Sequence, residues 1–351
     1  MKPKKTKVLI VDDSRSVRDL LSYILNSDPR IEIIGAVENG VKALNLLKSL
    51  KPDVITMDMD MPEMNGLEAT RIIMETNPIP IIMVTASWSP SDVNKTFSAL
   101  DAGAVSILNK PKGIGHPSHK MMALELVRTV ISMSEVKLVQ RWARLREGKE
   151  KLSVKYPEQK YKKADIKLVA IGASTGGPAV IQKILSELPK NLSVRVLLVQ
   201  HIAKGFLDGF LNWLIISTGH RIHIATHHEK VEPGHFYVAP DDFHMGISAG
   251  GNIVLKKNIS EDNLCPSVSY LFKCVAENYG MNAIGVILSG MGKDGARELK
   301  YMKDQGAITI AQDKESSVIN GMPGEACKIG ATKYILPPSE IAKMIVQQVN
   351  K

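Results

Sequence analysis

The chain has 351 residues, of which 44% are hydrophobic and 23% are charged, and its formal net charge at pH 7 is +9. This length leaves room for two domains, and the composition excludes a disordered or membrane-spanning chain because no apolar run approaches about 20 residues. The basic start, residues 1–5, leads directly into apolar residues 8–11 and leaves no space for a signal peptide. Three cysteines, Cys265, Cys274 and Cys327, form no Cys-x-x-Cys pair. We therefore predict a cytoplasmic protein with no membrane insertion.

Residues up to about Met133 alternate strand and helix signals. The helix expected after the first strand has apolar residues at Val17, Leu20, Leu21 and Ile24, the spacing of an amphipathic helix. Repeated βα units predict a parallel sheet with helices on both faces. The predicted strands are Val8–Val11, Ile31–Val37, Val54–Met57, Ile79–Val84 and Ala104–Leu108.

A basic segment separates this region from the rest of the chain. Nine basic residues and three acidic ones lie between Arg141 and Lys163, with few aromatic residues among them. Two interpretations stay open, a solvated tether or a contact with an acidic partner. Because the excess charge lies here and no compact helix-turn-helix signal follows, we predict no nucleic-acid partner. The predicted organisation is a first domain at 1–133, a linker at 134–164 and a second domain at 165–351.

A second strand and helix alternation begins at Ile166, so the predicted fold class is α/β with two doubly wound parallel-sheet domains. Residues His244 to Lys257, with two glycines at the centre, predict an inserted hairpin. The predicted strands are Lys167–Ile171, Val194–Gln200, Arg221–Thr226, Phe236–Ala239, Ala283–Leu288 and Ala307–Ala311. The predicted helices are Ala179–Leu188, Phe206–Ile216, Ser267–Asn278, Ala296–Gln305 and Glu340–Val349.

Polar residues follow the strands of the first domain where each strand ends. Asp12 and Asp13 end the first strand, Asp58 the third and Thr85 the fourth, and Lys110 follows the fifth. Carboxyl ends of parallel strands meet at one edge, where clustered carboxylates repel one another unless a cation such as Mg²⁺ neutralises them. The lysine and the threonine would stabilise a phosphoryl group on one aspartate. Any one of these residues alone would be explained as a loop residue or a helix cap.

These motifs resemble the signature of response-regulator receiver domains over Lys7 to about Val130. The resemblance implies a flavodoxin-like fold, a histidine kinase as phosphodonor and Asp58 as phosphoacceptor. The motifs that carry it are Asp12-Asp13, Met57-Asp58-Met59-Asp60-Met61-Pro62, Gly66, Thr85-Ala86 and Lys110-Pro111.

The same resemblance implies roles for the individual residues. Mg²⁺ would be held by Asp13, Asp58 and the backbone carbonyl of Asp60, with Asp12 assisting. The residues expected to transmit the switch are Thr85 and Lys110. One departure is Ile107, because receivers usually carry an aromatic residue three positions before the lysine.

The second domain begins with an apolar run, residues 168–171, followed by Gly172-Ala173-Ser174-Thr175-Gly176-Gly177. A Gly-x-Ser-x-Gly turn between a strand and a helix presents its hydroxyl in a cleft, beside helix-terminal N–H groups. A serine needs a base, and His201 ends the strand that contains residues 196–199. Asp294 lies in a glycine-containing turn after residues 286–289 and would orient the imidazole. The order Ser174, His201, Asp294 differs from the Ser, acid, His order of α/β-hydrolases.

Other interpretations of these residues stay open at this point. The glycine-rich turn would also suit a phosphate, His201 a structural role and Asp294 a helix N-cap. Four further histidines cluster in the sequence, but no carboxylate or cysteine completes a ligand set, so we predict no metal there. These histidines are His220, His223, His227 and His228.

This second domain resembles the catalytic domain of the chemotaxis methylesterases, the CheB family, from Lys167 to about Leu336. The clearest departure is Cys265, which takes the place of a commoner arginine. The motifs include residues 171–178, Gln200-His201, Pro233-Gly234, Tyr237-Val238-Ala239-Pro240, His244-Met245, Pro266-Ser267-Val268, residues 285–295, Ala311-Gln312-Asp313 and Gly321-Met322-Pro323.

The resemblance implies hydrolysis of glutamyl methyl esters on the cytoplasmic helices of chemoreceptors, and deamidation of selected glutamines, without a cofactor for hydrolysis. It implies that Ser174 is the nucleophile, His201 the base and Asp294 its orienting acid. Thr175 and the backbone N–H of Met291 would line the site near the oxyanion. We also hypothesise an intramolecular interface in which the unmodified receiver covers the Ser174 cleft. Rival hypotheses are a non-catalytic scaffold, a DNA-binding regulator and a dinucleotide oxidoreductase.

Overall fold

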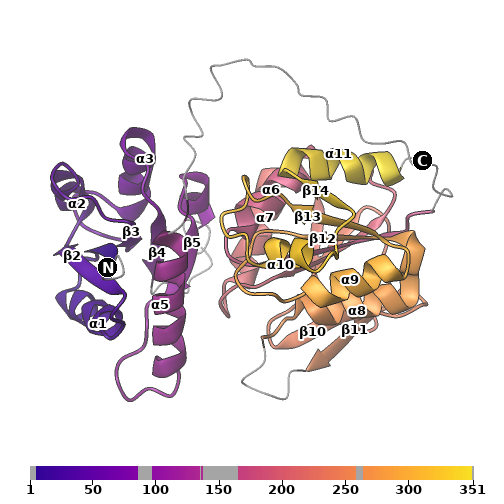
Figure 1. Ribbon diagram of the computed structural model, residues 1–351, viewed down its shortest axis with the longest axis horizontal. Coiled ribbons are helices and arrows are strands. Elements are labelled where there is room, and N and C mark those ends of the chain that lie inside the picture. The colour runs from indigo at the N-terminus through magenta and orange to yellow at the C-terminus, as the bar shows by residue number, and fades with distance from the viewer. Residues whose placement is uncertain (1–4, 86–96, 135, 137–164, 258–263, 350–351) are drawn as a thin grey trace. The chain divides into compact units, whose positions relative to one another are not determined.

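The computed structural model divides the chain into two compact units, with the division after Lys160 (Figure 1). It describes residues 5–85, 97–134, 136, 165–257 and 264–349. The predicted linker at 134–164 lies outside the described residues apart from Ser134 and Val136, so its bounds stay a prediction. No helix in the described ranges is long and apolar enough to cross a bilayer.

The first unit contains a five-stranded parallel sheet with the order β2-β1-β3-β4-β5, the flavodoxin-like order. Helices α1 and α5 pack together on one face, and α2 and α3 on the other (Figure 1). Because both faces are covered, β3 and β4 are buried throughout and β1 is buried from Val8 to Val11, and most of these residues are apolar. The elements are β1 (Thr6–Val11), α1 (Arg15–Asn26), β2 (Ile31–Val37), α2 (Gly40–Leu46), β3 (Val54–Met57), α3 (Gly66–Thr76), β4 (Ile81–Thr85), β5 (Ser106–Asn109) and α5 (His119–Ser134).

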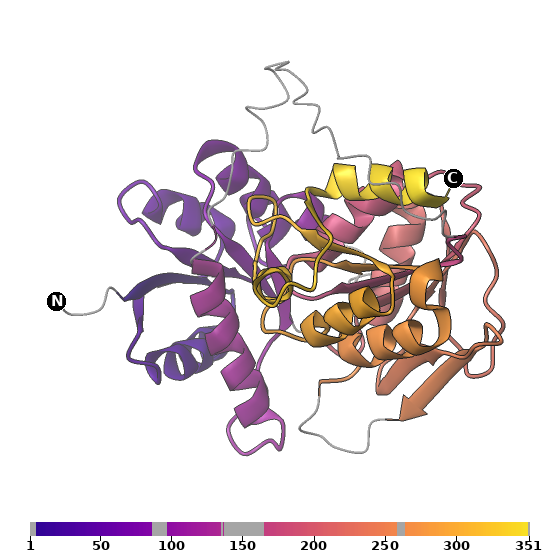
Figure 2. The same cartoon turned by 45° about the vertical axis from the view of Figure 1, so that its right-hand side comes forward.

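The second unit contains a seven-stranded parallel sheet with the order β14-β13-β12-β6-β7-β9-β8. Helices α6, α7 and α11 cover one face, and α8, α9 and α10 cover the other (Figures 1 and 2). The elements are β6 (Leu168–Ala173), α6 (Gly177–Glu187), β7 (Arg195–Gln200), α7 (Leu207–Thr218), β8 (Arg221–Ile224), β9 (His235–Val238), β10 (Phe243–Ile247), β11 (Ile253–Lys257), α8 (Val268–Tyr279), a 3-10 turn (Gly280–Asn282), β12 (Ala283–Ile287), α9 (Ala296–Asp304), β13 (Ile308–Gln312), α10 (Met322–Lys328), β14 (Tyr334–Leu336) and α11 (Pro338–Val349).

The strand order of the second sheet reverses between β6 and β12, its first and fifth strands. Ligands of open parallel sheets bind at such a switch point, outside the carboxyl ends of the strands. Ser174 directly follows β6, and Asp294 follows β12 by several residues. His201 directly follows β7, the neighbour of β6 on the other side. The fold therefore presents all three candidate residues at one edge of this sheet.

The predicted α/β class is confirmed by the two parallel sheets with helices on both faces. The inserted hairpin is confirmed because β10 pairs antiparallel with β11, and β10 packs against α8. Several predicted bounds were wrong. Strand β6 continues to Ala173 because its pairing with β7 extends to Gln200, so the turn begins only at Ser174. Strand β8 ends at Ile224 rather than at the predicted Thr226.

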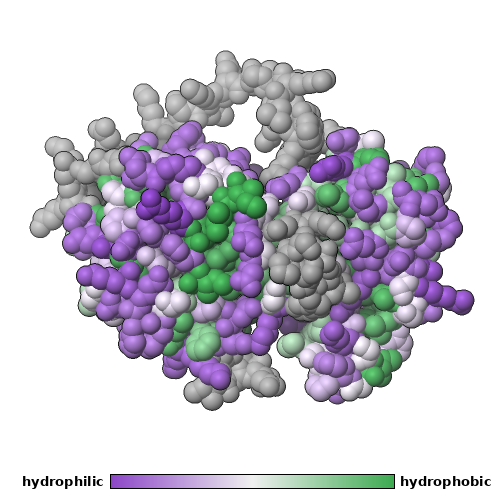
Figure 3. Space-filling model, turned by 180° about the vertical axis from the view of Figure 1, so that it is seen from behind, coloured by the Kyte–Doolittle hydropathy of each residue, from purple (hydrophilic) through white to green (hydrophobic). Residues whose placement is uncertain are grey.

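The visible surface in Figure 3 is mostly hydrophilic, with separate hydrophobic areas. Among the described residues, large exposed apolar side chains include Ile114 and Met121 in the first unit and Ile216 in the second. Single exposed apolar side chains are normal on globular proteins, so we assign these residues no role.

Candidate active site

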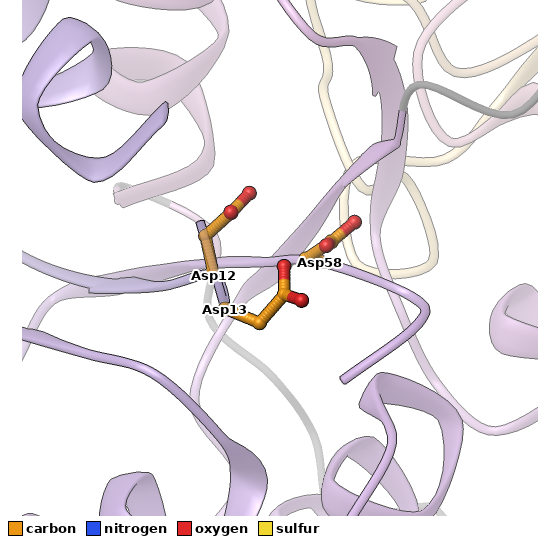
Figure 4. Close-up of side chains that lie close together, drawn as sticks. All are labelled: Asp12, Asp13 and Asp58. Carbon is orange, nitrogen blue, oxygen red and sulfur yellow. The ribbon is translucent and has the colours of Figure 1, made fainter. Parts of the chain in front are cut away.

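The first unit brings three carboxylates together at the ends of β1 and β3 (Figure 4). One ligand oxygen from each of Asp12, Asp13 and Asp58 lies within 4.8 Å of the others, and only Asp13 is exposed. Within the described parts of the chain, no other group of three or more His, Cys, Asp or Glu residues is arranged to hold a metal ion. An all-oxygen set at a partly open edge suits Mg²⁺.

Lys110 neutralises part of this negative charge. Its Nζ lies 2.8 Å from Asp12 Oδ2 and 2.8 Å from Asp58 Oδ2. Burial raises the pKa of Asp58 to about 6, although Lys110 opposes the shift. Burial alone would lower the pKa of Lys110, but its bonds to the two carboxylates raise it. Lys110 alone therefore does not fully offset the cost of burying the ionised Asp58 carboxylate.

The turn after β3 comes very close to Asp58. A Cβ atom on Gly66 would lie 2.0 Å from the Asp58 carbonyl oxygen, so only glycine fits at the start of α3. Asp60 is exposed in this turn. Thr85 is 2% exposed at the end of β4, and its carbonyl accepts a hydrogen bond from the Lys110 N–H at 3.0 Å. The roles predicted for these residues in metal binding and switching stay predictions.

The second unit joins His201 to Asp294 directly. The His201 Nε2 atom lies 3.0 Å from Asp294 Oδ2, and both side chains are largely shielded from solvent. An ionised carboxylate only accepts hydrogen bonds, so Nε2 carries the hydrogen and Nδ1 holds the lone pair. Nδ1 is therefore the atom of His201 that is available as a base.

Asp294 also receives hydrogen bonds from the first turn of α8. Its Oδ2 accepts from the Val268 N–H at 2.7 Å, and its Oδ1 accepts from the Ser269 N–H and the Ser267 hydroxyl, each at 3.0 Å. Burial works to raise the pKa of Asp294, but the bonds from His201 and this turn outweigh it and hold the pKa well below its usual range. The hydrogen bond from His201, together with those from the start of α8, thus keeps the Asp294 carboxylate ionised.

Ser174 lies beside His201 because β6 and β7 pair up to Ala173 and Gln200. The Ser174 N–H donates to the Ser289 carbonyl at 3.0 Å, and the His201 N–H donates to the Ala173 carbonyl at 2.9 Å. Among the described residues, no hydrogen bond joins the Ser174 hydroxyl to His201. Such bonds are often long in ligand-free enzymes and shorten with substrate, so the arrangement still suits proton transfer.

The turn after β12 lies against the serine. A Cβ atom on Gly290 would lie 2.7 Å from Ser174 Cβ, so a larger residue would displace Ser174. Met291 follows directly and is half-buried, as is Thr175, whose carbonyl accepts from the Ser289 hydroxyl at 2.8 Å. These positions are compatible with the predicted oxyanion roles of Thr175 and Met291, which stay predictions.

Sequence reasoning missed several residues of the site. No role was predicted for the Gln200 amide, the Ser289 hydroxyl or the Ser267–Ser269 turn. The role of Ser267 could have been predicted, because a serine directly before an apolar helix is a typical N-cap. In the structure its side chain accepts a hydrogen bond from the Tyr270 N–H. The alternative of Asp294 as a helix cap is partly right, but it caps α8 rather than α9, which follows it.

His220 and His223, two of the four clustered histidines, have hydrogen-bond partners within this unit, and Cys265 is a partly buried thiol. His220 is 5% exposed, and its Nε2 lies 2.8 Å from the Leu185 carbonyl oxygen. His223 Nε2 lies 2.8 Å from His235 Nδ1 on the neighbouring strand. Burial raises the pKa of Cys265 to about 11, so its thiol is not a nucleophile near neutral pH.

A flavodoxin-like unit with an acidic edge, joined to an α/β unit with serine, histidine and aspartate at one sheet edge, defines a two-domain signalling enzyme. Residues 169–345 match the CheB methylesterase model, and residues 8–116 match the response regulator receiver domain model. The chain belongs to the CheB methylesterase family.

Relatives and a solved structure agree with this assignment. The chain is 51% identical to protein-glutamate methylesterase/protein-glutamine glutaminase 1 of Syntrophus aciditrophicus, over 97% of each chain. It is 48% identical to the protein of the same type from Nitrosospira multiformis, over 97% of this chain and 96% of the relative. The crystal structure of the Thermotoga maritima CheB methylesterase catalytic domain is 37% identical, with a TM-score of 0.50, and covers 52% of this chain and 98% of that one.

Proposed function

We propose that this protein is a phosphorylation-regulated methylesterase and glutaminase. It hydrolyses glutamyl methyl esters, and deamidates glutamines, on the cytoplasmic helices of chemoreceptors, which places it in the cytoplasm. The observation that carries the proposal is the His201–Asp294 hydrogen bond of 3.0 Å beside the Ser174 turn. The names of relatives that align over nearly their whole length supply the substrate class.

The first half of the reaction forms an acyl-enzyme. The Ser174 hydroxyl attacks the γ-carbonyl carbon of the ester while His201 Nδ1 takes the hydroxyl proton. Asp294 stabilises the resulting imidazolium, and N–H groups near Thr175 and Met291 stabilise the oxyanion. The C–O bond to the methoxy group then breaks, and methanol leaves with the proton from His201.

The second half regenerates the enzyme. A water molecule attacks the acyl-serine carbonyl and gives one proton to His201, which returns a proton to Ser174 Oγ as the acyl bond breaks. The products are the glutamate side chain and the free serine. With glutamine in place of the ester, the same steps release ammonia instead of methanol.

The first unit would control this activity through Asp58. Asp12, Asp13, Asp58 and the carbonyl of Asp60 would hold Mg²⁺, which when bound neutralises the incoming phosphoryl group. Lys110 contacts Asp58 before phosphorylation and would pair with a phosphoryl oxygen afterwards. Thr85, at the neighbouring strand end, would donate its hydroxyl to the same group. A histidine kinase would supply the phosphate in the cell.

Methanol release from a methylated chemoreceptor fragment tests the proposal. We expect the full chain to release methanol, and to do so faster with Mg²⁺ and a small phosphodonor. The Ser174→Ala variant should release none, and Asp58→Asn should keep basal release but lose the stimulation. A parent chain that releases no methanol would refute the esterase assignment and favour a non-catalytic scaffold, whereas parental release by Ser174→Ala would show that Ser174 is not the nucleophile.

A further inference from the structure

Gln200 is a buried amide between the candidate nucleophile and the candidate base. It ends β7 and is 3% exposed. Its Nε2 donates to the Ser174 carbonyl at 2.9 Å and to the His201 carbonyl at 2.7 Å. One side chain thus uses both of its N–H groups to join the backbones of Ser174 and His201.

The orientation of this amide is fixed by its partners. Reversing it would place Oε1 against two carbonyl oxygens, which cannot donate hydrogen bonds. In the observed orientation Oε1 is buried and has no hydrogen-bond partner among the described residues. An unpaired buried acceptor lowers stability, so stability alone does not explain an amide at this position.

The first residue of α6 makes room for the amide. A Cβ atom on Gly177 would lie 2.3 Å from Gln200 Oε1 and 2.8 Å from Ala173 Cβ. The Gly177 N–H also donates to the Ser174 carbonyl, at 2.8 Å. The Ser174 carbonyl therefore accepts from both the helix start and Gln200, and a larger residue at 177 would displace one of these donors.

We propose that Gln200 is a positioning residue of the esterase, an inference that rests on the proposed function. Its amide sets the distance and angle between Ser174 and the His201 ring and does not touch the substrate. Proton transfer from the hydroxyl to Nδ1 requires hydrogen-bond distance, whereas substrate affinity does not depend on it. Loss of the amide should therefore lower kcat and leave KM nearly unchanged.

Two variants of similar side-chain size test this role. Gln200→Met removes both donors without adding charge, and we expect kcat to fall about 10- to 100-fold, since misplacing a reacting group by about 1 Å has such an effect. Gln200→Glu has no donor when ionised and repels both carbonyl oxygens. When protonated it donates one hydrogen bond, so its kcat relative to the parent should rise as the pH falls from 8 to 6. The relative kcat of Gln200→Met should not change with pH.

A matched control is Thr309→Val on β13, away from the Ser174 turn. Thr309 is also fully buried, and its hydroxyl accepts a hydrogen bond from the Lys333 N–H at 3.1 Å. This variant should lose stability in thermal unfolding yet keep the parental kcat and its pH profile. A purely structural role for Gln200 would make all three variants behave alike, with kcat ratios that do not depend on pH.

Parallel assays of Ser174→Ala distinguish a failure of the Gln200 positioning role from a failure of the proposed esterase mechanism. If Ser174→Ala is inactive and both Gln200 variants keep the parental kcat, the positioning role is wrong and the esterase assignment stands. If Ser174→Ala releases methanol at the parental rate, the proposed role of Ser174 as nucleophile fails and the positioning role of Gln200 fails with it. A lower kcat with unchanged KM in Gln200→Met, together with the pH-dependent recovery of Gln200→Glu, supports the proposal.

Discussion

The Asp294→Asn substitution probes the contact between His201 and the α8 turn. The carboxylate accepts four hydrogen bonds, from His201, Val268, Ser269 and the Ser267 hydroxyl. An amide has one oxygen, so its NH₂ group must face two of these four donors. Losing two such bonds to a charged acceptor, each worth about 1.5 to 3 kcal/mol, lowers the free energy of unfolding by about 3 kcal/mol or more.

The same substitution should reduce kcat by about four orders of magnitude, as is typical of an aspartate-to-asparagine change in a triad. If the NH₂ group faces His201, it favours the tautomer with hydrogen on Nδ1, which cannot accept the serine proton. In either orientation the neutral amide does not balance the imidazolium charge. KM should change little, because Asp294 contacts no substrate in the proposed mechanism.

Denaturant unfolding at several pH values and methanol release from a methylated receptor fragment measure both effects. Because the folded-state pKa of Asp294 is lowered, its ionisation stabilises the fold above the unfolded pKa of about 4. That stabilisation is lost as the pH falls through the folded value, so the difference from Asp294→Asn should shrink in acid. The control is Glu298→Gln, since Glu298 accepts from the Ser269 hydroxyl at 2.5 Å, whereas His201 bonds to Asp294. An Asp294→Asn kcat within tenfold of the parent would refute this reasoning.

Three further predictions concern buried groups near the two sites. Without Mg²⁺, Asp58→Asn should raise the stability of the first unit at pH 8 by the order of 2 kcal/mol, because the raised pKa makes the ionised form costly. This stabilisation should vanish near pH 4. Denaturation curves that show the same increase in stability at pH 8 and pH 4 would contradict the prediction. Gly66→Ala should weaken Mg²⁺ binding in titrations, since its Cβ would lie 2.0 Å from the Asp58 carbonyl oxygen; parental affinity would show that the turn can shift. Ser289→Ala should destabilise the fold by about 1 to 3 kcal/mol, because it leaves the Ile319 N–H without its acceptor. It should also slow the labelling of Ser174 by a fluorophosphonate. Unchanged labelling would show that the Ser289 hydroxyl does not help to hold the Ser174 turn.

Local patterns in the sequence were enough to place the strand ends that carry the sites. Apolar runs that stop at Asp12, Asp58, Ser174 or His201 mark buried parallel strands, and parallel topology brings their ends to one edge. The same reasoning missed β14 and α10. Strand β14 has only three residues and lies at the sheet edge, and α10 has seven residues that include a glycine and a proline. Neither is long enough to show a hydrophobic period.

The supporting contacts of the site depend on distances that no local pattern contains. Gln200 meets the Ser174 carbonyl across two paired strands, and Ser289 meets Thr175 from β12. The Asp294 side chain reaches α8, about 25 residues earlier, rather than the helix that follows it. Sequence reasoning therefore selected the three candidate residues Ser174, His201 and Asp294, and the packed structure was needed to show what holds them in place.

The most direct test of this account is to trap the reaction on the intact chain and identify the acylated residue by mass spectrometry. Incubation with a methylated receptor peptide followed by an acid quench should give a peptide adduct minus methanol on the fragment that contains Ser174. The adduct should be absent from Ser174→Ala and should accumulate far more slowly in His201→Gln. Methanol release without any adduct on Ser174, or an adduct on a different residue, would contradict the central claim.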